Sequence, residues 1–146
     1  HEPYPSGGQQ LQANYQGEGQ WGVAVLASAA GQIRDGVVRP MAVTSPARFP
    51  GFPEIPTLAE SGLPGFDLET WNVILGPPNM PQPVAEAINR AIVAALEDGA
   101  FRDRLITIGL APWRQPNGLP DARAFLQREV AKFQDVVTRT GVRLEP

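Results

Sequence analysis

Glycines and prolines divide residues 53–77 into segments so short that few local structures fit them. Residues 57–60 read Thr-Leu-Ala-Glu, a capping box in which a hydroxyl and a carboxylate satisfy free backbone donors at a helix start. We therefore predict a short helix there, which ends at Gly62 and the Pro-Gly pair that follows. The bulky, partly β-branched residues 71–75 (WNVIL) then predict a buried strand that ends at the next glycine.

The rest of the chain alternates strand-like and helix-like patterns. Ser6 or Gly7 can open a first short helix, because a small polar residue before a helix accepts from its free N–H groups. In the same way, Ser28 is expected to cap a helix that runs towards Asp35. From residue 83, apolar residues recur every three or four positions, which predicts helices packed on a sheet. The predicted helices are 7–15, 28–35, 83–99, 101–108 and 121–140, and the predicted strands are 21–25, 37–43, 71–75 and 111–114.

Strands that alternate with helices of this length predict an α/β fold. With 146 residues and 42% apolar content, the chain can bury one ordinary core. Its 16 prolines and 15 glycines lie between the periodic segments and fit turns between many short elements.

Charge and reactive side chains exclude several function classes. The net charge is −3 and the basic residues form no stripe, so nucleic acid is not an expected partner. The chain has no cysteine and a single histidine, His1, which excludes disulfides, thiolate metal sites and Cys-His catalysis. An enzyme would need a nucleophile with a base, or paired carboxylates in a pocket, whereas the acidic residues fall mainly on polar helix faces. We expect no catalytic residue, no metal and no cofactor.

Five segments along the chain follow the order and spacing of one protein family. They are residues 1–8 (HEPYPSGG), 31–45 (GQIRDGVVRPMAVTS), 53–77, 81–109 and 125–141. Together they resemble the tripartite tricarboxylate transporter substrate-binding proteins, the Bug-type periplasmic solute receptors. The resemblance covers nearly the whole chain.

The resemblance implies part of a two-lobe periplasmic binding protein-like (Venus flytrap) α/β fold, with mixed sheets flanked by helices. Residues 1–66 would be the C-terminal part of the second ligand-binding lobe. Residues 67–146 would return to the first lobe and end in a long helix. Members of this family are about twice as long, and the chain has no starting methionine, charged n-region or apolar signal segment, so we expect a processed or truncated product.

The same resemblance implies an extracytoplasmic, periplasmic solute-binding protein. Such receptors are associated with dicarboxylates, tricarboxylates, amino acids or aromatic acids, and they present the ligand to membrane permease subunits. Two alternatives stay open: a truncated fragment that binds no ligand, and a small hydrolase.

The sequence offers neutral donors for an acidic ligand. Residues 1–80 carry three arginines and seven acidic residues, so their overall charge does not attract an anion. The loop with Tyr4, Ser6, Gly7 and Gly8 leads into a predicted helix, whose free N–H groups and dipole suit a carboxylate oxygen. Ser28 follows the next predicted strand, and ligands of open α/β sheets lie beyond the carboxyl ends of strands. We predict these five residues as ligand contacts; the alternatives are a plain turn for the loop and a helix cap for Ser28.

Two further observations concern the ligand and the assembly. Gly22 stands where members of the family often have an aspartate, which predicts the loss of a polar contact or a different ligand. Helix stripes such as Val84, Ile88 and Ile92 would leave a large apolar surface in water without the sheet they were selected to cover. We therefore expect a homo-oligomer or an element-swapped dimer.

Overall fold

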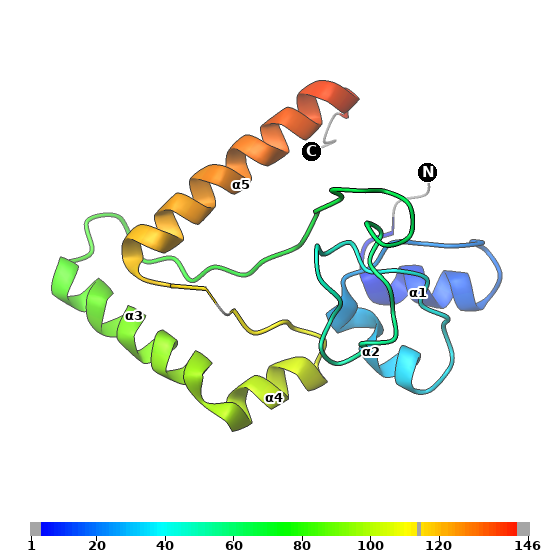
Figure 1. The fold of residues 1–146 in the computed structure, drawn as a ribbon, viewed down its shortest axis with the longest axis horizontal. Helices are drawn as coiled ribbons and strands as arrows, with labels where there is room; N and C mark the ends of the chain where they lie inside the picture. Colours follow the sequence, from blue (N-terminus) through cyan, green and yellow to red (C-terminus); the bar gives the residue numbers. More distant parts are fainter. Residues whose placement is uncertain (1–3, 114, 143–146) are drawn as a thin grey trace. The chain divides into compact units, whose positions relative to one another are not determined.

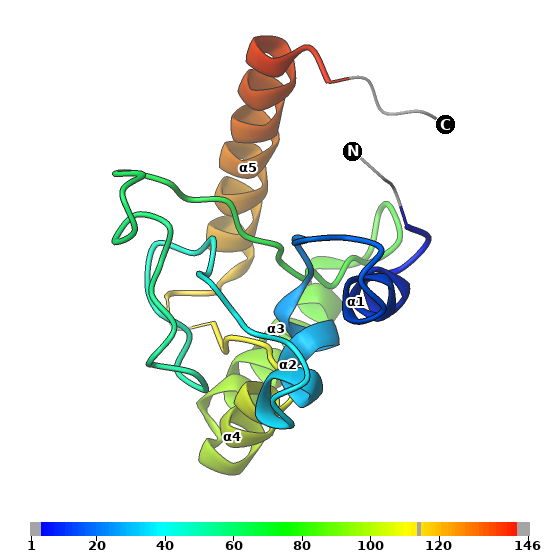
Figure 2. The same ribbon diagram turned by 90° about the vertical axis from the view of Figure 1, so that its right-hand side faces the viewer.

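The protein is analysed as a computed structural model, in which residues 4–113 and 115–142 are described (Figure 1). Five α-helices lie in this part of the chain, and Figure 2 shows them after a quarter turn. They are α1 (Gly7–Tyr15), α2 (Leu26–Arg34), α3 (Gln82–Glu97), α4 (Gly99–Thr107) and α5 (Leu119–Thr140). None of these helices is long and apolar enough to cross a membrane.

The chain forms two compact units. Unit 1 contains the residues up to Ile74 together with Asp98–Pro112, and so holds α1, α2 and α4. Unit 2 contains Leu75–Glu97 and the chain from Trp113 onward, and so holds α3 and α5. Each unit therefore combines segments that are distant in the sequence.

Predicted helix ends are confirmed where they depend only on residues of the adjoining turn. Ser6 precedes α1, and its Oγ accepts a hydrogen bond from the backbone N–H of Gln9 at 3.3 Å. Asp121, in the first turn of α5, accepts from the backbone N–H of Gly118 at 2.9 Å. Gly141 ends α5 with a φ of 66°, a left-handed conformation that glycine adopts at little cost. These interactions are local, which is why the sequence predicts them.

The prediction that Ser28 caps a helix is wrong. α2 begins two residues earlier, at Leu26, and its N-cap Val25 makes no side-chain hydrogen bond. The N–H of Ser28 donates to the Val25 carbonyl at 2.9 Å, so Ser28 already lies in the first turn. Leu26 and Ala30 pack in the core of unit 1, and we attribute the early start to this burial, since packing stabilises helices more than local preference does.

The capping box at residues 57–60 forms, but the helix predicted after it does not. The backbone N–H of Thr57 donates to the Glu60 carboxylate at 2.8 Å, and the N–H of Glu60 donates to the Thr57 hydroxyl at 3.0 Å. Only a short turn follows, because Gly62 takes a φ of 109° and Pro64 has no backbone N–H to donate. The prediction is right for the hydrogen bonds and wrong for the helix.

No β-strand is assigned in residues 4–113 and 115–142, although four were predicted. Within these ranges an isolated parallel bridge joins Val43 to Thr57. A strand needs a ladder of hydrogen bonds to a neighbour, and the predicted strand 71–75 has none assigned. Mixed sheets flanked by helices therefore stay a prediction. Arg114, in the last predicted strand, and His1 lie outside the described residues.

The core of unit 1 forms where α2 meets the loop around residues 49–55. Phe49, Phe52, Ile55 and Ala30 form a cluster in which no side chain is more than 6% exposed. The two phenylalanine rings lie 6.0 Å apart, and the Arg34 guanidinium lies 5.1 Å from the centre of the Phe52 ring. Four partly buried apolar side chains surround this cluster: Leu26, Ile33, Val43 and Ile106. α2 therefore buries one face against an irregular loop.

Unit 2 has much less of a core. α3 contacts α5, and Trp113 meets the Phe125 ring edge-on, with ring centres 5.0 Å apart. The Asn89 side chain donates to the Asn117 carbonyl at 2.8 Å, which ties α3 to the loop before α5. α3 contains no buried residue, although it carries a predicted core stripe. Five stripe residues of the two helices are at least 40% exposed: Val84, Ile88, Val130, Phe133 and Val137.

The accessible surface of the chain is large for its mass, at 11006 Å². By the scaling of surface with mass, two separate compact bodies with the masses of units 1 and 2 would expose about 8,700 Å² together. The chain therefore exposes roughly 2,300 Å² more than compact units would.

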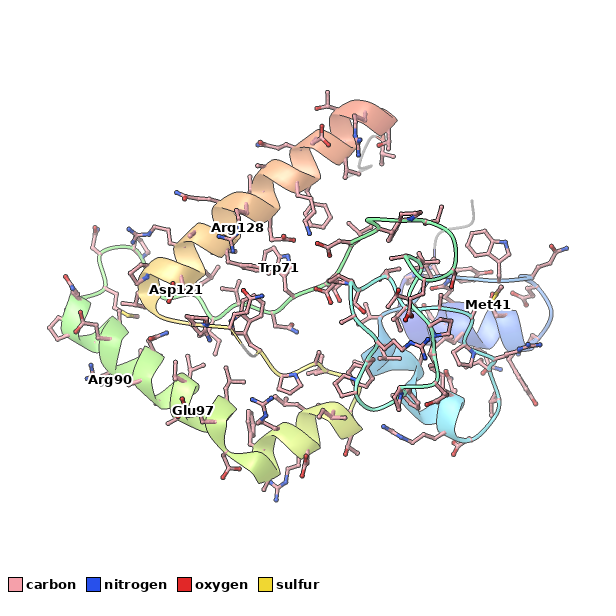
Figure 3. The ribbon with its side chains drawn as sticks, viewed as in Figure 1. Met41, Trp71, Arg90, Glu97, Asp121 and Arg128 are labelled. Atoms are coloured by element: carbon pink, nitrogen blue, oxygen red, sulfur yellow. The ribbon has the colours of Figure 1, made fainter. Side chains whose placement is uncertain are left out.

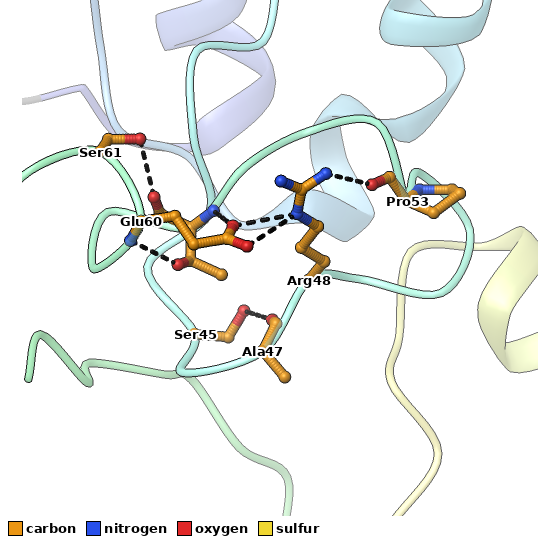
Figure 4. A network of polar contacts seen from close by, with 7 residues as sticks. Ser45, Ala47, Arg48, Pro53, Glu60 and Ser61 are labelled. Carbon is orange, nitrogen blue, oxygen red and sulfur yellow. Dashed lines mark hydrogen bonds and ion pairs between the residues drawn. The ribbon is translucent and has the colours of Figure 1, made fainter.

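A polar network holds the turn that contains the capping box (Figure 4). The Arg48 Nε donates to both Glu60 carboxylate oxygens, at 2.9 and 3.1 Å, and its Nη1 donates to the Pro53 carbonyl at 2.9 Å. The Ser61 hydroxyl donates to the Thr57 carbonyl at 2.8 Å. The backbone N–H of Thr57 and then the Arg48 side chain lower the pKa of Glu60 below its ordinary 4.5.

We expect the Glu60 carboxylate to stabilise unit 1 only while it is ionised. Because its pKa is lower in the folded state, this stabilisation is fully present above about pH 4.5 and is lost as the pH falls through the folded-state value. At neutral pH, Glu60→Gln should therefore have a lower free energy of unfolding than the unaltered chain. The difference between the two free energies should narrow below about pH 4.5. Glu54→Gln, at an exposed position in the same loop, is the control. A gap that stays constant down to pH 3 would contradict the prediction.

Candidate functional site

The structure brings predicted site residues together on α1 and α2 of unit 1. Ser6 is the N-cap of α1, and Gly7 and Gly8 are its first two residues. Ser28 lies in α2, with its Oγ only 3.2 Å from the position that a Cβ on Gly7 would occupy. A glycine at this position therefore allows the two helices to approach closely. Tyr4 is half-buried two residues before the cap, and its place in the site stays a prediction.

The N-terminal turn of α1 offers donors for an anion. The N–H of Gln9 is taken by the Ser6 hydroxyl, whereas the N–H groups of Gly7 and Gly8 have no acceptor within the helix. No acidic residue lies in this turn, so no side chain compensates the positive end of the helix dipole there. The Ser28 side chain is exposed and has no hydrogen-bond partner among the described residues. This combination suits a carboxylate oxygen.

Two carboxamides that the sequence analysis missed face the segment after α1. Gln10 and Asn14 lie one turn apart on this helix. A Cβ on Gly22 would touch Gln10 Nε2 and lie 2.8 Å from Asn14 Nδ2, so both amide groups reach the Gly22 backbone. The signal that could have identified them is their spacing from Gly7, because residues i, i+3 and i+7 share one face of a helix.

An open groove also lies in unit 2, between α3 and α5. Its lining includes Arg90 (Figure 3) and Arg123, but also Glu86, whose side chain accepts a hydrogen bond from Gln82 at 2.8 Å. Two arginines and one glutamate give the lining a net charge of +1, but the groove contains none of the predicted site residues. In the part of the chain that is described, no group of three or more His, Cys, Asp or Glu residues could hold a metal ion. We therefore place the candidate site at α1.

Comparison with known proteins gives a family match over nearly the whole chain. The family model described as tripartite tricarboxylate transporter family receptor matches residues 1–142. Protein BugT of Bordetella pertussis is 32% identical over 114 residues, which are 77% of this chain and 34% of BugT. A UPF0065 protein of Agrobacterium vitis, from the TAR-I ttuE-ttuC' intergenic region, is 32% identical over 111 residues, 75% of this chain and 32% of that protein. The chain thus spans about a third of the length of these relatives.

Solved structures have the same fold over most of the chain. Rpa4515 of R. palustris with adipate matches with a TM-score of 0.85 at 25% identity, over 96% of this chain and 46% of Rpa4515. MatC of Rhodopseudomonas palustris with bound malate matches with a TM-score of 0.73 at 30% identity, over 93% of this chain and 47% of MatC. The periplasmic binding protein BugD matches with a TM-score of 0.70 at 28% identity, over 80% of this chain and 39% of BugD. The chain therefore has part of a solute-binding fold and, as the order of its segments predicted, belongs to the tripartite tricarboxylate transporter receptor family.

Proposed function

We propose that the chain is the C-terminal portion of a periplasmic receptor that binds a small organic carboxylate for a tripartite tricarboxylate-type transporter. The observation that carries the proposal is the uncompensated first turn of α1 beside Ser28, in a chain of this receptor family. Two related structures hold adipate and malate, which are both dicarboxylates. We therefore take a dicarboxylate as the ligand class.

The proposed contacts bind an anion without a cationic side chain. The N–H groups of Gly7 and Gly8 donate to the ligand carboxylate, and the Ser28 hydroxyl donates to it from α2. Hydrogen bonds to an ionised acceptor are about twice as strong as those between neutral groups. Because acidic residues outnumber arginines in residues 1–80, these local donors and not the overall charge would provide the attraction. Tyr4 and Ser6 would border the ligand on the loop side.

The family also supports proposals for the partners and the lobes. Residues 1–66 would belong to the second ligand-binding lobe, and residues 67–146 would return to the first. The receptor would present its ligand to membrane permease subunits and catalyse no reaction. The permease contact can be tested with a photo-crosslinking amino acid at an exposed position of the receptor. Mass spectrometry then identifies the membrane protein that becomes crosslinked.

The proposed site predicts that a negative charge in the first turn of α1 weakens binding. Gly8→Asp suits this test, because a Cβ on Gly8 would meet nothing closer than Ser6 Oγ at 4.0 Å and an acid in a first turn stabilises a helix. We expect calorimetry to show that the unaltered chain binds adipate or malate, and that Gly8→Asp binds it at least about tenfold more weakly. Gly8→Ala is the control and should bind within about twofold of the unaltered chain.

Two outcomes would contradict the proposal. Equal affinity of Gly8→Asp and the unaltered chain would place the carboxylate elsewhere. Absence of binding by this chain, together with binding by a longer family member, would favour a fragment with no ligand binding of its own. That alternative has one observation in its favour, since the chain spans only 46% of Rpa4515.

A further inference from the structure

Residues 72–76 (NVILG) form an exposed segment that leads towards α3 (green in Figure 1). Its three large apolar side chains, Val73, Ile74 and Leu75, are each at least 38% exposed. None of the five residues makes a hydrogen bond with a residue that the structure describes. The segment therefore offers an apolar surface together with backbone N–H and C=O groups that the described part of the chain leaves without a partner.

Hydrogen bonds on both sides limit the length of this segment. Upstream, the N–H of Leu68 donates to the Thr44 carbonyl at 3.1 Å. Downstream, the N–H of Met80 donates to the Pro77 carbonyl at 3.3 Å and closes a turn. The two prolines in this turn have no N–H, so a ladder of strand hydrogen bonds cannot continue through it. A partner strand therefore has residues 72–76 to pair with.

The sequence of the segment suits pairing with a second copy of itself. The nearest charged residues on either side are Glu69 and Glu86, so two aligned segments bring no like charges together. In antiparallel pairing about a two-fold axis, one residue lies opposite its own counterpart. An axis at Ile74 places Val73 opposite Leu75, and apolar side chains meet along the pair.

The neighbouring registers fit less well. An axis at Val73 would set Ile74 opposite the polar Asn72. An axis at Leu75 would set Val73 opposite Pro77, which has no N–H to donate. The sequence thus favours the axis at Ile74.

We propose that residues 72–76 of two copies of this chain pair as antiparallel strands about a two-fold axis at Ile74. Each strand supplies the main-chain partners that the other lacks, as in other cases where a strand is added across an interface. The inference is independent of the proposed ligand and identifies the surface through which the chain meets a second copy.

The exposed surface of the chain is large enough for such a dimer. A two-stranded ribbon alone is marginally stable in water, so a second layer has to cover it. The stripe residues of α3 and α5 described above supply apolar surface for this layer. The surplus of roughly 2,300 Å² exceeds the about 800 Å² per partner that a standard interface needs.

Disulfide crosslinking tests the register. The chain has no cysteine, so one introduced thiol reports on one position. Ile74→Cys sets two thiols opposite each other, with Cα atoms about 4.5–5.5 Å apart, a separation that a disulfide spans. Under mild oxidation it should form a covalent dimer at least about tenfold faster than Ile108→Cys, which replaces another exposed isoleucine.

A mixture of two variants tests the same register from the flanking positions. Val73→Cys lies opposite position 75 of the second copy, whereas two thiols at position 73 lie about 7–8 Å apart, too far for a disulfide. Mixing Val73→Cys with Leu75→Cys should therefore give the mixed covalent dimer in preference to either homodimer.

Amide hydrogen exchange of the unaltered chain tests the hydrogen bonds themselves. In a two-stranded antiparallel pair, every second N–H donates to the partner strand and the others point away from it. As the concentration rises through the dissociation constant, either the amides of residues 72, 74 and 76 or those of 73 and 75 should exchange at least about tenfold more slowly. Contact between apolar side chains without strand pairing would not produce this alternation.

Three outcomes would overturn the inference. Equal crosslinking rates of Ile74→Cys and Ile108→Cys would show that the segment does not meet its counterpart. Faster crosslinking of Val73→Cys alone than of Ile74→Cys would contradict the axis at Ile74. Slow exchange of the segment at every concentration, including that of the monomer, would show that the chain covers the segment itself. None of these results bears on ligand binding at α1.

Discussion

Ile55→Ala is expected to lower the free energy of unfolding of unit 1 by about 2–5 kcal/mol. Ile55 is 3% exposed and belongs to a cluster with Ala30, Phe49 and Phe52, so truncation leaves a cavity that its neighbours fill poorly. The effect is large for this chain because the cluster is small and domains of this size are only marginally stable. Urea unfolding, followed by the circular dichroism signal of the helices at 222 nm, measures this free energy of unfolding.

The matched control removes the same atoms from an exposed position. Ile108 also lies in unit 1 and is 54% exposed, so Ile108→Ala should change the free energy of unfolding by less than about 1 kcal/mol. Similar losses in Ile55→Ala and Ile108→Ala would contradict the location of the core between α2 and the loop at residues 49–55.

Self-association of the chain is the second large effect that we expect. Ile74 and Leu75 are 71% and 75% exposed, and the sequence has no charged residue between Glu69 and Glu86. In natural proteins, charged residues on edge strands prevent pairing with another chain. An extended apolar segment without charges lacks this protection and pairs readily with another chain. The roughly 2,300 Å² of surplus surface exceeds the about 800 Å² per partner that a standard interface needs. We propose a homo-oligomer or an element-swapped dimer.

Lysine at both apolar positions should disrupt this association. Ile74→Lys with Leu75→Lys removes two apolar side chains from the interface and should raise the dissociation constant at least about 100-fold. Gln12→Lys with Gln16→Lys adds the same charge at exposed polar positions and serves as the control. Sedimentation equilibrium measures the constants. A folded, monomeric unaltered chain at the highest soluble concentration would refute the proposal.

Local sequence predicted the parts of the fold that depend on neighbouring residues. The Ser6 cap, the Asp121 hydrogen bond and the Gly141 helix end each involve atoms within four residues. Asp98, which was not predicted as a cap, also acts locally, because it accepts from the Phe101 N–H at 2.7 Å and starts α4. The ends of α3, α4 and α5 therefore lie within two residues of the predicted ends, although α4 and α5, like α2, begin two residues early.

Features that depend on distant residues could not be predicted in this way. The start of α2 follows burial of Leu26 in the core and not the polar side chain of Ser28. A strand at residues 71–75 needs neighbouring strands to hydrogen-bond with, and the composition of this segment does not show whether such neighbours are present. In the candidate site, the first turn of α1 was visible from the sequence, whereas the contact of Gln10 and Asn14 with Gly22 appears only in the folded unit.

The central claim is that main-chain and neutral side-chain donors at the start of α1 hold an organic acid. Backbone amide chemical shifts during titration of the isotope-labelled chain with adipate test it most directly. We predict saturable shifts of Gly7, Gly8 and Ser28, and unchanged signals in α3 and α5. Shifts confined to the α3–α5 groove, or no shift at any adipate concentration, would contradict this account.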